Sequence, residues 1–250
     1  ERRKCRGDRT QGGLSGGDKA GMTRGLRLRS RGKSPTDDGR RMDAGALAAA
    51  VHNDRRAGAI PLAVVATVGT TSTTAIDPVP EIAEICEREK MWLHVDASYG
   101  GTAAILPEMR YVLDGCDRAD SLVVNPHKWL FTPMDCSALY TSRPDLLKRA
   151  FQHVADYLVV SEGEGVVNLM DYGIALGRRF RALKLWFVIR NFGVEGLQSL
   201  VREHIRIAQN LAPWHDDDPA LERMPHVNFS TVGFRHRPPG ITGTRPDKTH

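Results

Sequence analysis

Residues 91–101, MWLHVDASYGG, and residues 121–129, SLVVNPHKW, decide the fold of this 250-residue chain. Each stretch begins with a short apolar run and then turns polar, at Asp96 in the first and at Asn125 in the second. Apolar runs of this length, ended by turn-forming residues, predict buried strands over 91–95 and 121–124. Polar side chains therefore follow both predicted strands at the point where each strand ends.

Strands and helices are predicted to alternate along the rest of the chain. This alternation is typical of an α/β fold whose sheet is at least partly parallel. The apolar patterns predict strands over 60–67, 138–141 and 227–234, helices over 42–57, 80–90, 174–191 and 194–212, a mobile glycine-rich loop over 161–165, and a helix capped by Ser142 with Pro144 at its first position.

The positive charge of the chain is concentrated in its first residues. Residues 1–41 hold 13 Lys and Arg against 5 Asp and Glu, a net charge of +8, which leaves −3 for residues 42–250 out of the total of +5. Residues 1–39 also contain few large apolar side chains, so we expect a disordered basic leader. An RNA-binding arm is the alternative, but no aromatic residues interleave the basic ones, and we therefore expect no nucleic-acid partner.

The composition indicates an ordinary cytoplasmic protein. No apolar run is long enough to cross a bilayer, and no apolar stretch follows the basic N-terminus as a secretory signal requires. The four cysteines, Cys5, Cys86, Cys116 and Cys136, form no C-x-x-C pair and no zinc-ligand spacing with His. We expect reduced thiols, no disulfide framework and no metal site.

Asp96 and Lys128 carry the chemistry that the sequence predicts. Both lie near the carboxyl ends of predicted strands, the edge where open α/β sheets bind ligands. A lysine amine that burial keeps neutral forms a Schiff base with an aldehyde, and an aspartate keeps a pyridine nitrogen protonated. These are the two groups that pyridoxal phosphate (PLP) needs. Taken singly, a strand-end Asp is more often a turn residue and a Lys more often a surface charge.

Four ordered blocks strengthen this interpretation: ATVGTT at 66–71, HVDASYGG at 94–101, NPHKW at 125–129 and LGRRFR at 176–181. In order and spacing they resemble the group II PLP-dependent decarboxylases, most closely the aromatic-L-amino-acid branch. The resemblance extends from about Arg40 to Arg237. It implies the aspartate-aminotransferase fold (fold type I), a homodimer, and decarboxylation of L-amino acids to amines.

The resemblance also implies roles for individual residues of the cofactor pocket. Lys128 would bind PLP as a Schiff base, and Asp96 would pair with the pyridinium nitrogen. Thr71 would lie near the ring and the substrate carboxylate. Ser98 would lie beneath the ring, where the family often has Ala.

Three further residues complete the predicted site. Asn125 and His127 would line the pocket, with His127 near the cofactor phosphate. Tyr157 stands at the position of the family's loop tyrosine, which returns a proton to the substrate carbon after carbon dioxide leaves, as a phenol within hydrogen-bond reach can do. Relatives with Phe there tend toward aldehyde synthesis, so Tyr157 favours decarboxylation over the aldehyde-synthase alternative.

One departure from the family concerns length. The chain lacks a substantial N-terminal part that supplies the imidazole stacked on the ring and much of the phosphate site. Neither His52 nor His94 stands in a motif that matches the stacking imidazole. We therefore expect a leader (1–39), a partial PLP-binding large domain (40–190) and a partial C-terminal small domain (191–250). A catalytically silent homologue remains the alternative to an active decarboxylase.

Overall fold

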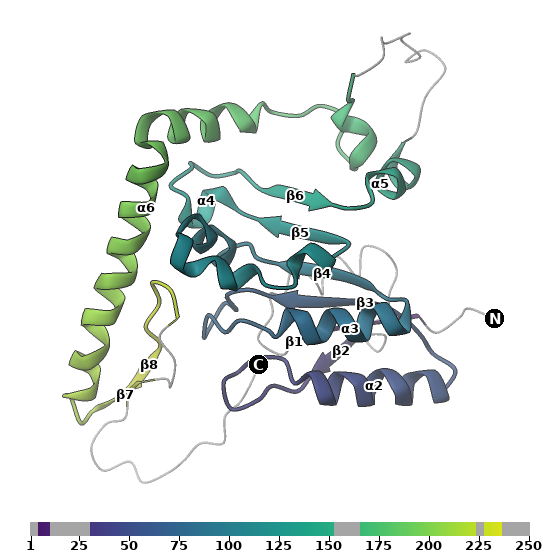
Figure 1. Ribbon diagram of the computed structural model, residues 1–250, viewed down its shortest axis with the longest axis horizontal. Coiled ribbons are helices and arrows are strands. Elements are labelled where there is room, and N and C mark those ends of the chain that lie inside the picture. The colour runs from purple at the N-terminus through teal and green to yellow at the C-terminus, as the bar shows by residue number, and fades with distance from the viewer. Residues whose placement is uncertain (1–4, 11–30, 153–165, 224–227, 237–250) are drawn as a thin grey trace.

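The computed structural model describes residues 5–10, 31–152, 166–223 and 228–236 (Figure 1). In chain order its strands (β), helices (α) and 3-10 helices (η) are β1 (Cys5–Thr10), β2 (Arg31–Ser34), α2 (Ala44–Arg56), β3 (Ile60–Thr67), α3 (Val79–Glu89), β4 (Trp92–Asp96), η2 (Gly100–Ile105), η3 (Pro107–Leu113), η4 (Cys116–Arg118), β5 (Ser121–Val124), α4 (Pro126–Trp129), β6 (Ala138–Thr141), α5 (Pro144–Phe151), η6 (Leu169–Tyr172), α6 (Arg181–Asp216), β7 (Leu221–Arg223) and β8 (Phe234–His236).

A six-stranded sheet in the order β2-β1-β3-β4-β5-β6 forms the centre of the fold. Strands β1 to β5 run parallel, and β6 pairs antiparallel with β5 at the edge. The register places Thr67, Asp96 and Val123 beside one another across β3, β4 and β5. The predicted α/β fold with a partly parallel sheet is therefore confirmed, and the carboxyl ends of these strands share one edge.

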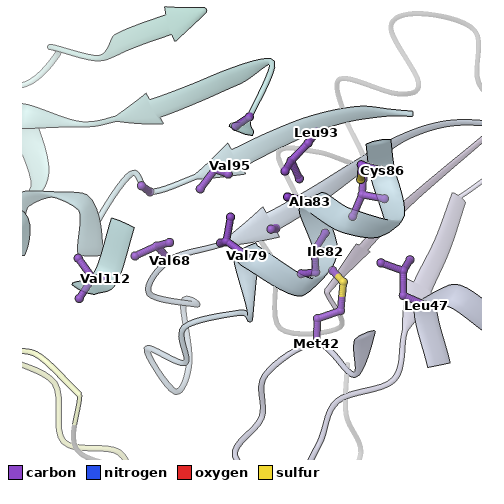
Figure 2. Close-up of a cluster of buried hydrophobic side chains, with 14 of the residues drawn as sticks. Met42, Leu47, Val68, Val79, Ile82, Ala83, Cys86, Leu93, Val95 and Val112 are labelled. Atoms are coloured by element: carbon purple, nitrogen blue, oxygen red, sulfur yellow. The ribbon is translucent and has the colours of Figure 1, made fainter. Parts of the chain in front are cut away.

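Helices α2 and α3 cover one face of the sheet (Figure 1). Helix α3 buries the apolar side of an amphipathic pattern, and Figure 2 shows Val79, Ile82 and Cys86 from this helix within the core cluster that includes Leu93 and Val95 of β4. Burial of a side chain as large as Ile82 stabilises the fold by about 1.5–3 kcal/mol. This packing fixes β4, and with it the position of the residues at its end.

Asp77, in the loop between β3 and α3, is 2% exposed. Its carboxylate accepts hydrogen bonds from the backbone N–H groups of Met42 and Thr67, both at 2.7 Å. The Asp77 N–H in turn donates to the Thr67 carbonyl at 2.9 Å. A single buried carboxylate thus connects the end of β3 to the segment that leads into α2.

Helix α6 differs from the two predicted helices over 174–191 and 194–212. It begins only at Arg181, because Ile174 and Leu176 are 93% and 72% exposed and have no packing surface that would stabilise an earlier start. The predicted break does exist, since Gly193 has φ 66° and ψ 177° inside the element. Beyond it, Leu197 and Val201 are buried.

Two other local predictions are wrong. Ser142 does not cap α5: Arg143 occupies the cap position, and the Ser142 hydroxyl donates to the Asp120 carbonyl at 3.3 Å, although Pro144 does begin the helix. The strand predicted over 227–234 is also wrong, because within residues 228–236 only Phe234–His236 form a strand. Residues 228–233 instead make side-chain contacts with η2 and the β3–α3 loop, described below.

The disorder predicted for residues 1–39 is wrong for two segments, because β1 and β2 both belong to the central sheet. Backbone pairing with β3 orders β1 without a large apolar content, and Arg6 Nη1 donates to Asp54 Oδ1 of α2 at 2.8 Å. Residues 1–4, 11–30 and the predicted loop 161–165 lie outside the described residues.

The described part of the chain contains no helix long and apolar enough to cross a membrane. Within the same residues, no group of three or more His, Cys, Asp or Glu side chains has the arrangement of a metal site. Cys86, Cys116 and Cys136 are free thiols. Burial raises the pKa of Cys86 and of Cys116 to about 12, which makes both thiols poor nucleophiles.

Candidate active site

A cavity of about 330 Å³ lies at the carboxyl ends of β3 and β4. Parallel strands bring the loops that follow them to the same edge of the sheet, which is why residues from separate segments meet here. The cavity is lined by Thr67, Gly69, Thr70, Thr71, Thr74, Asp96, Ser98, Tyr99, Lys128 and Thr231.

Asp96 is the last residue of β4, and its carboxylate lines the cavity. Its Oδ1 accepts a hydrogen bond from the backbone N–H of Ser98 at 3.1 Å, and its carbonyl accepts one from the Val68 N–H at 2.9 Å. The backbone at the strand end therefore holds the carboxylate in place.

Lys128 reaches the cavity from α4, the one-turn helix that follows β5. Pro126 at the first position favours the start of this helix, and the Lys128 N–H donates to the Asn125 carbonyl at 2.9 Å. The Lys128 side chain is exposed, so the burial that the sequence predicted as a cause of deprotonation is not found.

The structure brings Lys128, Asp96, Ser98 and Thr71 into one cavity, but Asn125 and His127 are not among the lining residues. The Asn125 side chain accepts a hydrogen bond from the Ser137 hydroxyl at 2.6 Å. His127 Nδ1 instead lies 3.0 Å from the backbone nitrogen of Cys136. Both side chains therefore bind the segment between α4 and β6. Tyr157 lies outside the described residues.

Several lining residues were not predicted, and threonines dominate them. Thr231 belongs to a segment, 228–231, that closes one side of the cavity. The Thr74 hydroxyl donates to the Asn228 carbonyl at 3.0 Å, and Asn228 Nδ2 donates to the Thr74 carbonyl at 3.2 Å. The Tyr99 hydroxyl lies 2.5 Å from the Ser230 hydroxyl. No local pattern marks Thr74 and Thr231, because only the fold brings segments so far apart in sequence together.

Glycine is required at two positions beside the cavity. Gly69 has φ +89°, a conformation that side chains with a Cβ rarely adopt. A Cβ on Gly100 would lie 2.6 Å from the Val68 carbonyl oxygen and 2.9 Å from the Phe229 ring. Gly100 therefore permits a close approach of the chain to Val68 and to Phe229.

His94 is not among the residues that line the cavity. Its Nδ1 lies 2.8 Å from the Ser121 hydroxyl, which also accepts a hydrogen bond from Trp92 Nε1 at 2.9 Å. Burial lowers the pKa of His94 below 6.5, and the charge of Asp96 opposes this shift. His94 is thus a buried neutral histidine on the strand that carries Asp96.

A family model described as "Pyridoxal-dependent decarboxylase conserved domain" matches residues 14–237. The chain belongs to this family. The mouse aromatic-L-amino-acid decarboxylase is 41% identical over 220 residues, 87% of this chain and 45% of the relative. A tryptophan decarboxylase of Camptotheca acuminata is 44% identical over 205 residues, 81% of this chain and 40% of the relative. The chain thus spans less than half the length of these curated relatives.

Solved structures agree with this assignment and with the fold predicted from the resemblance. The Oryza sativa TDC structure with PLP and tryptamine superimposes with a TM-score of 0.89 and 36% identity, over 94% of this chain and 49% of the other. A Rhodiola rosea 4-hydroxyphenylacetaldehyde synthase gives a TM-score of 0.85 and 30% identity, over 95% and 50%. The family's cofactor is PLP, and its reaction class is that of PLP-dependent carboxy-lyases.

Proposed function

We propose that this chain carries the PLP site of an L-amino-acid decarboxylase that acts on aromatic substrates. The observation that carries the proposal is that Lys128 and Asp96 line the same cavity. The curated relatives named above act on aromatic amino acids or tryptophan by their names, which supports the aromatic substrate class.

The described residues fit the ring and the aldehyde of PLP. A cavity of about 330 Å³ lies within the range of small-ligand sites, roughly 300–1,000 Å³. It offers an amine for the aldehyde, a carboxylate for the ring nitrogen, and the hydroxyls of Ser98 and Thr71 for polar atoms of the ligand. Ser98 is 6% exposed, so its hydroxyl lies at the inner wall of the cavity.

When bound, PLP supplies an electron sink that stabilises the negative charge left on the substrate when the carboxyl group departs. Lys128 would hold the cofactor through its ε-amine and release it when the substrate amine takes its place. Asp96 would keep the proton on the ring nitrogen, and the backbone N–H of Ser98 holds this carboxylate in position. The Thr71 side chain is exposed and would donate a hydrogen bond to the substrate carboxylate.

Tyr157 completes the proposed mechanism on the ground of its sequence position alone. Its phenol would donate the proton that the substrate carbon needs after decarboxylation. A Tyr157→Phe variant should then release less amine and more aldehyde and peroxide from the same substrate. An unchanged product ratio would remove Tyr157 from the mechanism.

Cofactor capture tests the proposed function. The purified chain is mixed with PLP, reduced with borohydride, and mapped by mass spectrometry. The expected result is a phosphopyridoxyl label on Lys128 that Lys128→Ala removes and Asp96→Asn weakens, followed by amine release from Trp, Tyr, Phe or dihydroxyphenylalanine. Label spread over surface lysines would contradict the proposal and favour a silent homologue. Oxygen consumption with aldehyde release from the unaltered chain would indicate an aldehyde synthase.

We propose further that two copies of the chain associate through the first half of α6. Six apolar side chains there are 41–58% exposed: Leu183, Trp186, Phe187, Ile189, Phe192 and Val194. A concentration of exposed apolar surface usually marks an interface. Sedimentation should show a dimer that Phe187→Glu dissociates; a monomeric unaltered chain would contradict the proposal. A cytoplasmic location stays a prediction.

A further inference from the structure

Trp129 directly follows Lys128 and points away from solvent, with 4% of its surface exposed. Its indole stacks on the Tyr99 ring with 4.9 Å between centroids and 16° between planes. The Phe229 ring packs edge-on against Trp129 at 5.7 Å and against Tyr99 at 6.0 Å. Two rings from separate segments therefore pack against the residue beside Lys128, and one of them, Tyr99, lines the cavity.

The indole N–H of Trp129 has an acceptor on another element. It donates to Nδ1 of His204, on α6, at 3.2 Å. His204 is half-buried, and the Phe131 ring packs edge-on against its imidazole at 5.4 Å. Because an indole N–H can only donate, Nδ1 of His204 is the acceptor in this hydrogen bond.

Helix α4 depends on such a contact for its orientation. It has only four residues, too few for a helix to be stable without tertiary packing. Lys128 and Trp129 are adjacent in this single turn, so a rotation that moves the indole also moves the lysine amine. The ring cluster provides non-directional packing, whereas the hydrogen bond to His204 fixes one orientation of the indole.

We propose that His204 is a positioning residue: through Trp129 it orients the turn of α4 that presents Lys128 to the cavity. The proposal rests on the proposed function, in which Lys128 is the lysine that binds PLP. It assigns to α6 a role at the site although no residue of this helix lines the cavity.

Two variants of His204 distinguish the role of its hydrogen-bond acceptor from that of its side-chain volume. In His204→Asn, the side-chain oxygen takes the place of Nδ1, while His204→Leu keeps an apolar side chain without an acceptor. Trp129→Phe removes the donor but keeps an aromatic ring. The control is His52→Leu, since His52 is an exposed histidine on helix α2. Urea unfolding and circular dichroism of each full-length variant establish that it is folded before comparison.

Three measurements follow on the folded variants. Hydrogen exchange of the Trp129 indole, assigned by its loss in Trp129→Phe, and reductive methylation of Lys128 by formaldehyde and borohydride both need no cofactor. PLP capture at Lys128 is the third. Loss of one buried hydrogen bond should accelerate indole exchange and weaken PLP capture by about tenfold in His204→Leu. We also expect the rate of Lys128 methylation to change in His204→Leu, with His204→Asn and His52→Leu unchanged in all three measurements.

Trp129→Phe should change Lys128 methylation and PLP capture by as much as His204→Leu does. The double variant should show no larger change in either measurement than the single variants. Faster indole exchange with unchanged Lys128 methylation would overturn the proposal, because His204 would then only pack α6. Equal losses in His204→Asn and His204→Leu would also overturn it. An unaltered chain that fails PLP capture would refute the proposed function, while indole exchange and lysine methylation would still decide the role of His204.

Discussion

The carboxylate of Asp77 allows a test of how the end of β3 is held beside the cavity. In Asp77→Asn, the amide oxygen still accepts a hydrogen bond from one of the two backbone N–H groups. The amide NH₂ group is itself a donor, so it accepts no hydrogen bond from the other N–H group. A buried N–H without a partner costs about 1–3 kcal/mol, and the remaining bond weakens by about 1 kcal/mol without the negative charge. The free energy of unfolding should fall by about 2–4 kcal/mol.

Urea unfolding followed by circular dichroism measures this loss, and Asp43→Asn is the matched control. Asp43 also accepts a hydrogen bond from a backbone N–H, that of Ala46 at 2.9 Å, but Asp43 is an exposed helix cap. Asn caps helices about as well as Asp, so the control should change stability by less than about 0.5 kcal/mol. If Asp77→Asn is no more destabilising than Asp43→Asn, the two buried hydrogen bonds do not hold the loop as we infer.

Other predictions address the core and the titratable groups. Because burial lowers the pKa of His94 below 6.5, the unfolded chain binds a proton at this histidine at higher pH than the folded chain does. The free energy of unfolding should therefore fall as the pH drops below 6.5. In unfolding curves measured over a pH series, His94→Gln should make this fall smaller. Ile82→Ala should cost about 2–5 kcal/mol in urea unfolding, whereas Leu62→Ala, at a side chain that is 41% exposed, should cost clearly less; equal losses would contradict the assigned core. Cys86 and Cys116 should resist iodoacetamide at pH 8 until urea unfolds the chain, and rapid labelling of either thiol in the folded chain would show that its pKa is not raised.

The elements that the sequence predicted correctly are those with a clear apolar pattern. Strands β3, β4 and β5 and helices α2 and α3 were placed within a few residues, because each buries a continuous or periodic apolar set; β6 was placed too, although its Leu139 and Tyr140 are 53% and 61% exposed. The strands at the other edge were missed, because β1 and β2 are held by backbone pairing and their sequence is polar. Pattern alone cannot reveal a strand whose ordering comes from its neighbour.

The candidate site shows the same division. Asp96 and Lys128 were recognisable because a strand end is a local feature and the lysine stands in a distinctive block. Thr74 and Thr231 carried no such signal, since their place in the cavity depends on contacts between distant segments. The family resemblance implied a pocket role for His127, but in a single helical turn adjacent side chains point in different directions, and His127 does not line the cavity.

The hydrogen bonds between Thr74 and Asn228 join residues separated by 154 positions. On a ribosome, the segments that bear Asp96 and Lys128 emerge well before segment 228–231 does. Contacts of such long range form late in folding, because closing the intervening loop costs entropy before the contact contributes any stabilising free energy. The cavity is therefore open on one side in any intermediate that lacks this segment. A ligand that binds only the closed cavity would stabilise the last step of folding in proportion to its concentration.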